Sequence, residues 1–137
     1  EARPHIRELR TALESQPIRD LLSRAQTRSR APKEATELEL GPEWPFALLE
    51  DAALASGRID RLVIARAEGR AIWAEVIDFK TDAAVQQHAS PDSAAIQARH
   101  RAQMDAYRRA AARSLGLAED HIAGALAMLS TRSVVRC

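Results

Sequence analysis

The feature that most constrains the fold is a pair of apolar segments on either side of the turn sequence Glu68-Gly69-Arg70. Residues 52–67 alternate and become apolar towards their end, and residues 71–77 are largely apolar beyond the turn. Such segments, joined by a short turn that contains glycine, are typical of an antiparallel β-hairpin. The chain is therefore expected to contain a β-sheet that includes this hairpin.

The hairpin predicts that two carboxylates lie close together. Asp60 and Asp78 are each eight residues from the nearer end of the Glu68-Gly69-Arg70 turn, so antiparallel pairing carries both to the same end of the sheet. Lys80 shares the face of Asp78 because strand side chains alternate, and Phe79 between them points the other way, into the core. We therefore expect two acids and one ammonium group at one end of the sheet.

These three groups indicate a metal-dependent phosphodiesterase. Hydrolysis of a phosphodiester requires neutralisation of charge on the phosphoryl oxygens and delivery of a water molecule, and hard divalent cations do both. Magnesium needs only one or two carboxylates from the protein, which Asp60 and Asp78 supply. Lys80 would polarise the water or stabilise charge on the phosphate, and it is one of only 2 lysines, against 18 arginines. The alternative is a surface salt bridge at a strand end, which contributes little.

The remaining elements are read from hydrophobic periodicity and from glycine and proline positions. Before the hairpin we expect one kinked helix or two short helices over residues 6–25 with a break at Pro17, followed by a polar stretch at residues 27–33. A strand at residues 36–40, ended by Gly41-Pro42, and a short strand at residues 46–49 come next. After the hairpin we expect a polar substrate-facing loop at residues 82–91, a helix at residues 93–115 closed by Gly116, a strand at residues 122–129 and a last element from residue 133.

Composition excludes several classes of protein. The chain has 137 residues, 46% of them hydrophobic and 28% charged, which is the content of about one globular domain. Cys137 is the only cysteine, so the chain cannot form an internal disulfide, a zinc site with several thiolates or a cysteine-ligated iron–sulfur cluster. No apolar run reaches the roughly 18 residues needed to cross a bilayer, and no signal peptide is visible. We therefore expect a cytoplasmic protein without a membrane partner.

Two residues on the predicted long helix extend the constellation. Gln103 and Tyr107 are one helical turn apart and share a face, so they could bind phosphate or base edges, or support Lys80. By contrast, Glu75 lies three residues before Asp78, which places it on the opposite face of the strand. We do not expect Glu75 to be a metal ligand.

In this order the motifs resemble those of a known family. Gly57-Arg58-Ile59-Asp60-Arg61, Ile77-Asp78-Phe79-Lys80-Thr81 and Gln103-Met104-Asp105-Ala106-Tyr107 together are similar to the motifs of the RecB-like nuclease domains of the PD-(D/E)XK superfamily. The resemblance covers residues 57–107, and it is specific only when the three motifs are taken together.

The resemblance implies a fold, an activity and a set of site residues. The implied fold is an α+β fold, an α/β sandwich with an α-β-β-β-α-β core in which helices flank a mixed central sheet. The implied activity is hydrolysis of DNA with Mg²⁺ or Mn²⁺. The implied roles are Asp60 and Asp78 as metal ligands together with the backbone carbonyl of Phe79, Lys80 as the catalytic lysine, and Gln103 and Tyr107 as a signature pair beside the DNA.

The family context implies partners as well. RecB-like domains lie at the C-termini of bacterial helicase-nucleases of the RecB and AddA kind, so we expect residues 1–137 to be a single nuclease domain from a longer helicase-nuclease. Such a protein processes double-strand breaks for recombination as an exonuclease, receives single strands from the helicase and pairs with an AddB- or RecC-like subunit. The family's metal-binding histidine is expected upstream of this chain, so the isolated domain could be inactive.

One alternative is a catalytically inactive domain of the same fold that binds DNA or a partner; another is an unrelated α+β binding domain with Asp60 and Asp78 far apart.

Overall fold

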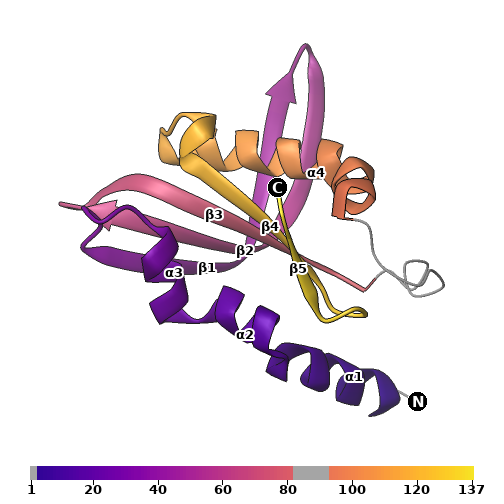
Figure 1. Ribbon diagram of the computed structural model, residues 1–137. Coiled ribbons are helices and arrows are strands. Elements are labelled where there is room, and N and C mark those ends of the chain that lie inside the picture. Colours follow the sequence, from indigo (N-terminus) through magenta and orange to yellow (C-terminus); the bar gives the residue numbers. More distant parts are fainter. Residues whose placement is uncertain (1–2, 82–92) are drawn as a thin grey trace.

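A central five-stranded sheet with helices on both faces forms the protein, and the computed structural model describes residues 3–81 and 93–137 (Figure 1). The predicted substrate-facing loop at residues 82–91 lies outside the described residues. The elements in chain order are α1 (Arg3–Glu14), α2 (Gln16–Leu22), α3 (Arg24–Arg30), β1 (Glu37–Glu50), β2 (Ala53–Ala67), β3 (Arg70–Lys80), α4 (Ser93–Leu115), the short 3₁₀ helix η2 (Glu119–His121), β4 (Ile122–Met128) and β5 (Ser133–Arg136).

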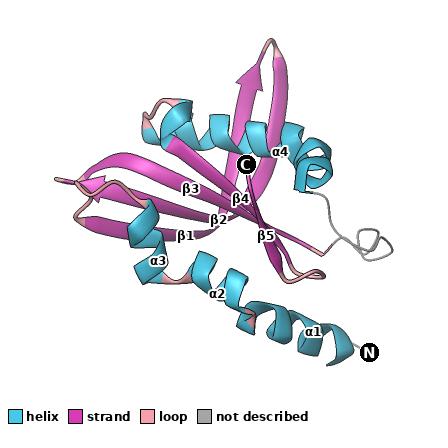
Figure 2. Ribbon diagram, in the orientation of Figure 1, coloured by secondary structure: helices cyan, strands magenta, loops and turns pink. Residues whose placement is uncertain are grey.

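The sheet is mixed, with strand order β1-β2-β3-β4-β5. Strands β1, β2 and β3 pair antiparallel, β3 pairs parallel with β4, and β4 pairs antiparallel with β5. A parallel pair requires a long crossover, and α4 supplies it by crossing one face of the sheet (Figure 2). The α+β class with a mixed sheet flanked by helices is therefore confirmed. Within the described part of the chain, no helix is long and apolar enough to cross a membrane.

The predicted hairpin is β2–β3, and a bulge adjusts its register. Its turn residues Glu68 and Gly69 have φ angles of 52° and 77°, the left-handed conformation that two-residue hairpin turns favour. The register shifts after Ala65, where β3 contributes an additional residue, so that the last pair joins Arg61 to Ile77. Without this shift the two-residue turn would place Ile77, not Asp78, opposite Asp60. Because a one-residue slip turns side chains to the other face, the bulge is required to bring the two acids together.

The N-terminal segment forms three helices where one or two were predicted. The break falls at Ser15, and Pro17 lies in the first turn of α2, where its missing N–H costs no hydrogen bond. Helix α3 (Arg24–Arg30) extends into the polar stretch at residues 27–33, for which the sequence predicts no helix. Its N-terminus is capped by the Ser23 hydroxyl, which accepts a hydrogen bond from the Gln26 backbone N–H at 3.3 Å.

Strand β1 does not end at Gly41-Pro42 as predicted, and it includes the second short strand predicted at residues 46–49. It lies at the edge of the sheet. At an edge, a proline whose backbone nitrogen faces solvent interrupts no hydrogen bond between strands. The irregularity that Gly41-Pro42 indicated is present one residue later, since Glu43 has a φ angle of 49°. The strand therefore continues through a local distortion.

Both faces of the sheet are covered by apolar packing. On one face Leu62 and Val76 pack against α4, and on the other Ile77 packs against Leu21 of α2. Phe79 packs with this second layer, as the alternation predicted. Helix α4 ends as expected at Gly116, whose φ angle of 68° permits a left-handed C-cap. The end of the β2–β3 hairpin that carries Asp60, Asp78 and Lys80 therefore lies in a sheet that is packed on both faces.

Candidate functional site

The structure brings together all five side chains that the sequence singled out. Asp60 lies on β2, Asp78 and Lys80 lie on β3, and Gln103 and Tyr107 lie on α4. Lys80 Nζ is 2.7 Å from Asp78 Oδ2 and donates a hydrogen bond to Gln103 Oε1. Gln103 Nε2 in turn donates to Tyr107 Oη at 3.0 Å. A continuous line of polar contacts therefore runs from Asp78 through Lys80 and Gln103 to Tyr107.

Asp60 is positioned by its own strand and by the backbone of β3. Asp60 Oδ2 accepts a hydrogen bond from the Phe79 backbone N–H at 2.9 Å. The alternation of β2 is interrupted here, because Ile59 and Leu62 both belong to the core layer under α4 although they are three residues apart. The next residue, Arg61, anchors the strand to the other layer by donating from Nη2 to the Leu22 carbonyl at 3.2 Å. Asp60 therefore lies where the alternation of β2 is interrupted, and the residues next to it contact the layers on both faces of the sheet.

The electrostatic environment of Asp78 opposes its ionisation. The residue is only 4% exposed, and its burial, which is the largest cause, acts together with neighbouring Asp60 to raise the pKa of its carboxyl from 3.8 to about 6. Lys80 acts in the opposite direction without cancelling the increase. Burial and the two acids also raise the pKa of the Tyr107 phenol above its usual value, so it keeps its proton at neutral pH. Such shifts are typical of functional sites, where groups are held at a cost in stability.

The pKa of Asp78 predicts how stability depends on pH in the absence of metal. Between pH 3.8 and about 6 the folded protein binds more protons than the unfolded chain, so its free energy of unfolding falls as pH rises through this window. The expected loss is roughly 3 kcal/mol, at about 1.4 kcal/mol per pKa unit. We expect Asp78→Asn to lack this loss and to be the more stable protein above pH 6. Urea unfolding in EDTA at pH 4 to 8 measures the difference in free energy of unfolding between Asp78→Asn and the wild type, which should grow with pH. A difference that stays constant with pH would contradict the raised pKa of Asp78.

The carboxylates are a suitable site for a hard divalent cation. Asp78 Oδ2 is buried, and within the described residues it forms no hydrogen bond, only the ion pair with Lys80. The described residues contain no cluster of three or more His, Cys, Asp and Glu side chains that could hold a metal. Two acids are few for zinc, but they suit Mg²⁺ or Mn²⁺, which complete their shell with carbonyl oxygens, water and substrate. The donors present therefore fit the expected cation.

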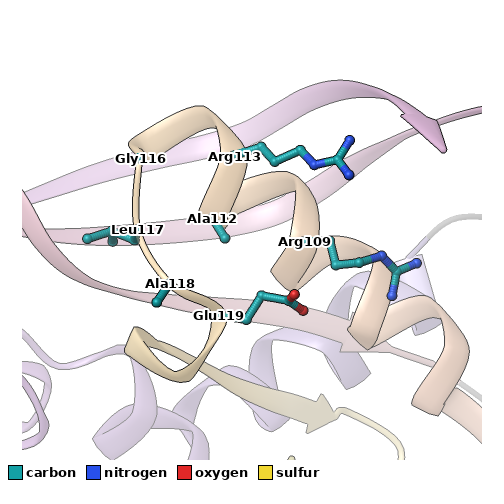
Figure 3. Close-up of a pocket in the computed structure, with 7 residues that line it drawn as sticks. All are labelled: Arg109, Ala112, Arg113, Gly116, Leu117, Ala118 and Glu119. Atoms are coloured by element: carbon teal, nitrogen blue, oxygen red, sulfur yellow. The ribbon is translucent and has the colours of Figure 1, made fainter.

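A separate cleft lies at the C-terminal end of α4 and does not include the predicted site. It has a volume of about 400 Å³, and Figure 3 shows its lining by Arg109, Ala112, Arg113, Gly116, Leu117, Ala118 and Glu119. The two arginines are held by β1: Arg109 Nε is 2.8 Å from Glu50 Oε2, and Arg113 Nη1 donates to the Leu49 carbonyl at 3.1 Å. Local sequence patterns do not predict these contacts, because the partners are about 60 residues apart.

A buried ion pair on the opposite face of the sheet was also not predicted from the sequence. Glu75 is fully buried and faces away from Asp78 as predicted, and Arg30 of α3 binds it through two hydrogen bonds of 2.8 and 2.7 Å. Arg136 of β5 approaches the same carboxylate at 3.3 Å. A glutamate within an apolar strand is a signal that a cation must be near, but it does not say which of 18 arginines provides the charge.

Comparison with known proteins agrees with this geometry. The family model of the PD-(D/E)XK nuclease superfamily matches residues 2–134, nearly the whole chain. None of the curated proteins compared with the chain matches it.

Proposed function

The chain belongs to the PD-(D/E)XK nuclease superfamily, and we propose that it is a metal-dependent deoxyribonuclease domain with Asp60, Asp78 and Lys80 as its catalytic residues. Members of this superfamily are usually metal-dependent nucleases, and nuclease domains generally bind DNA. The observation that carries the proposal is the convergence of two acids and an ammonium group, with Lys80 Nζ 2.7 Å from Asp78 Oδ2.

In this proposal Asp60 and Asp78 hold Mg²⁺ or Mn²⁺, together with the backbone carbonyl of Phe79. The hydrogen bond from the Phe79 N–H to Asp60 supports this arrangement. It holds the Asp60 carboxylate next to the residue whose carbonyl oxygen would be the third ligand. When bound, such an ion neutralises charge on the phosphoryl oxygens and lowers the pKa of a coordinated water.

The roles of the remaining residues follow from their contacts. Lys80 carries the positive charge that would orient the attacking water or stabilise the phosphate as charge develops on it. Gln103 accepts a hydrogen bond from Lys80 and donates one to Tyr107, so it restrains a side chain that would otherwise be flexible. Gln103 and Tyr107 are therefore proposed to hold Lys80 in place beside the DNA.

The biological setting is proposed from the motifs alone. The order of the Gly57–Arg61, Ile77–Thr81 and Gln103–Tyr107 motifs supports a RecB- or AddA-type nuclease domain of a longer helicase-nuclease, with exonuclease activity in double-strand-break processing and recombination. Its partners would be single-stranded DNA delivered by the helicase and an AddB- or RecC-like subunit. Cleavage by the longer parent protein, with and without ATP-driven unwinding of a duplex, tests this setting.

Metal binding to the two acids tests the site independently of cleavage. We expect Mn²⁺ or Mg²⁺ to stabilise the wild type by about 2.7 kcal/mol at a concentration one hundred times the Kd, because the ion binds only the folded chain. Asp60→Asn and Asp78→Asn should lose this stabilisation, whereas Asp120→Asn, whose side chain is 83% exposed, should keep it. Thermal unfolding with a metal titration measures the effect, and equal stabilisation of all four proteins would refute the ligand assignment.

A further inference from the structure

Beyond Asp60, strands β1 and β2 continue as a two-stranded ribbon. Strand β2 pairs with β3 only over residues 61–67, whereas its pairing with β1 extends to the pair of Glu50 and Ala53. In Figure 1 this ribbon projects past α4. Because an isolated two-stranded ribbon is only marginally stable in water, its contacts with α4 determine where it lies.

Two sets of contacts fix the ribbon to α4. Near the tip, Glu50 and the Leu49 carbonyl bind the two arginines described above. Nearer the candidate site, the rings of Phe46 and Tyr107 meet edge to face, with centroids 5.6 Å apart and an interplanar angle of 80°. The ribbon therefore contacts the same tyrosine whose hydroxyl accepts a hydrogen bond from Gln103.

Gly57 provides the space for this ring contact. It pairs with Phe46 across the ribbon, and a Cβ atom at Gly57 would lie 3.1 Å from both Phe46 Cε1 and Phe46 Cζ. The same atom would lie 3.8 Å from Tyr107 Cε1. A side chain at position 57 must therefore displace Phe46, and Phe46 is in contact with Tyr107, which is only 8% exposed and cannot move freely.

We propose that Gly57 and Phe46 are positioning residues for Lys80, acting through Tyr107 and Gln103. The route begins with the pairing of Gly57 and Phe46 across the ribbon, where glycine leaves room for the ring. Three contacts follow: the Phe46 ring on the Tyr107 ring, Gln103 Nε2 on Tyr107 Oη, and Lys80 Nζ on Gln103 Oε1. The contacts themselves are independent of activity, and their catalytic significance rests on the function proposed above. The carboxylates Asp60 and Asp78 are not on this route.

Lysine-selective ¹³Cε labelling provides a direct test, because the chain has only two lysines. Lys33 is exposed and serves as the internal reference, while Lys80 reports on its contacts with Gln103 and Asp78. We expect Phe46→Leu and Gly57→Ala to shift the Lys80 signal in the same direction as Tyr107→Phe, which removes the phenol that holds Gln103. Leu54→Ala, on the same ribbon but 70% exposed, should leave both lysine signals in place.

Kinetics of the same variants separate positioning from folding. A misplaced ammonium group should lower kcat about 10- to 100-fold while the Mn²⁺ affinity and KM stay close to those of the wild type. The inference is overturned if Tyr107→Phe shifts the Lys80 signal but folded Phe46→Leu does not. If the signals shift as expected and the wild type cleaves no DNA, the positioning contacts stand and the proposed function fails.

Discussion

Lys80→Met should reduce DNA cleavage by about 10³-fold while metal binding is retained. The ammonium group is the only cation that contacts Asp78 within the described residues, and charge stabilisation by one such preorganised group has an effect of about 10² to 10³. Methionine keeps most of the length and volume of the side chain, so the fold should be preserved. Cleavage of a labelled single-stranded oligonucleotide with Mn²⁺ measures the rate, and calorimetry measures the affinity for the metal.

Lys33→Met is the matched control, because it removes the other lysine at an exposed position. It should cleave at the wild-type rate. Removal of the Lys80 charge beside the acids should leave Mn²⁺ affinity equal or slightly higher, since a competing cation is lost. A Lys80→Met protein that cleaves as fast as Lys33→Met would eliminate Lys80 as a catalytic residue.

Glu75→Gln should lower the free energy of unfolding by about 3 to 5 kcal/mol, the usual cost of breaking a buried ion pair. The substitution retains the shape of the side chain but leaves Arg30, only 19% exposed, without its bidentate partner. It also removes the negative charge that favours the partly buried guanidinium of Arg61, whose pKa is lowered mainly by burial. Urea unfolding at neutral pH measures the loss.

A double-mutant cycle separates the ion pair from general packing effects. Arg30→Met and Glu75→Leu should each destabilise the protein, because each leaves the other charge of the ion pair without its partner. The double variant, Arg30→Met with Glu75→Leu, should recover much of the loss by removing both charges. Additive losses in the double variant would mean that Arg30 and Glu75 do not interact. Glu39→Gln is a suitable control, because its ion pair with Arg66 has a similar 2.8 Å distance but lies at the surface.

The parts of the fold that the sequence predicted are those specified by local pattern. Apolar segments on both sides of Glu68-Gly69-Arg70 specified the β2–β3 hairpin, and the glycine at position 116 specified the end of α4. Period-two alternation also placed Asp78 and Lys80 on one face, with Phe79 and Glu75 on the other. These features depend on residues that are neighbours along the chain.

The features that the sequence did not predict depend on partners far apart in the chain. Helix α3 is polar apart from Ala25, and its ion pair joins Arg30 to a residue 45 positions away. Strand β1 continues through Pro42 only because it lies at the sheet edge, which hydrophobic periodicity does not reveal. The hairpin bulge after Ala65 was also missed, although the expected meeting of Asp60 and Asp78 required it.

The most direct test of the proposed catalytic site is the metal dependence of DNA cleavage by the wild type and by Asp78→Asn. The two proteins, or their longer parents with the same change, would be incubated with a labelled single-stranded oligonucleotide in EDTA, Mg²⁺ and Mn²⁺. A metal site at Asp60 and Asp78 predicts cleavage only by the wild type and only with metal. Equal cleavage by both proteins, or undiminished cleavage in EDTA, would contradict it.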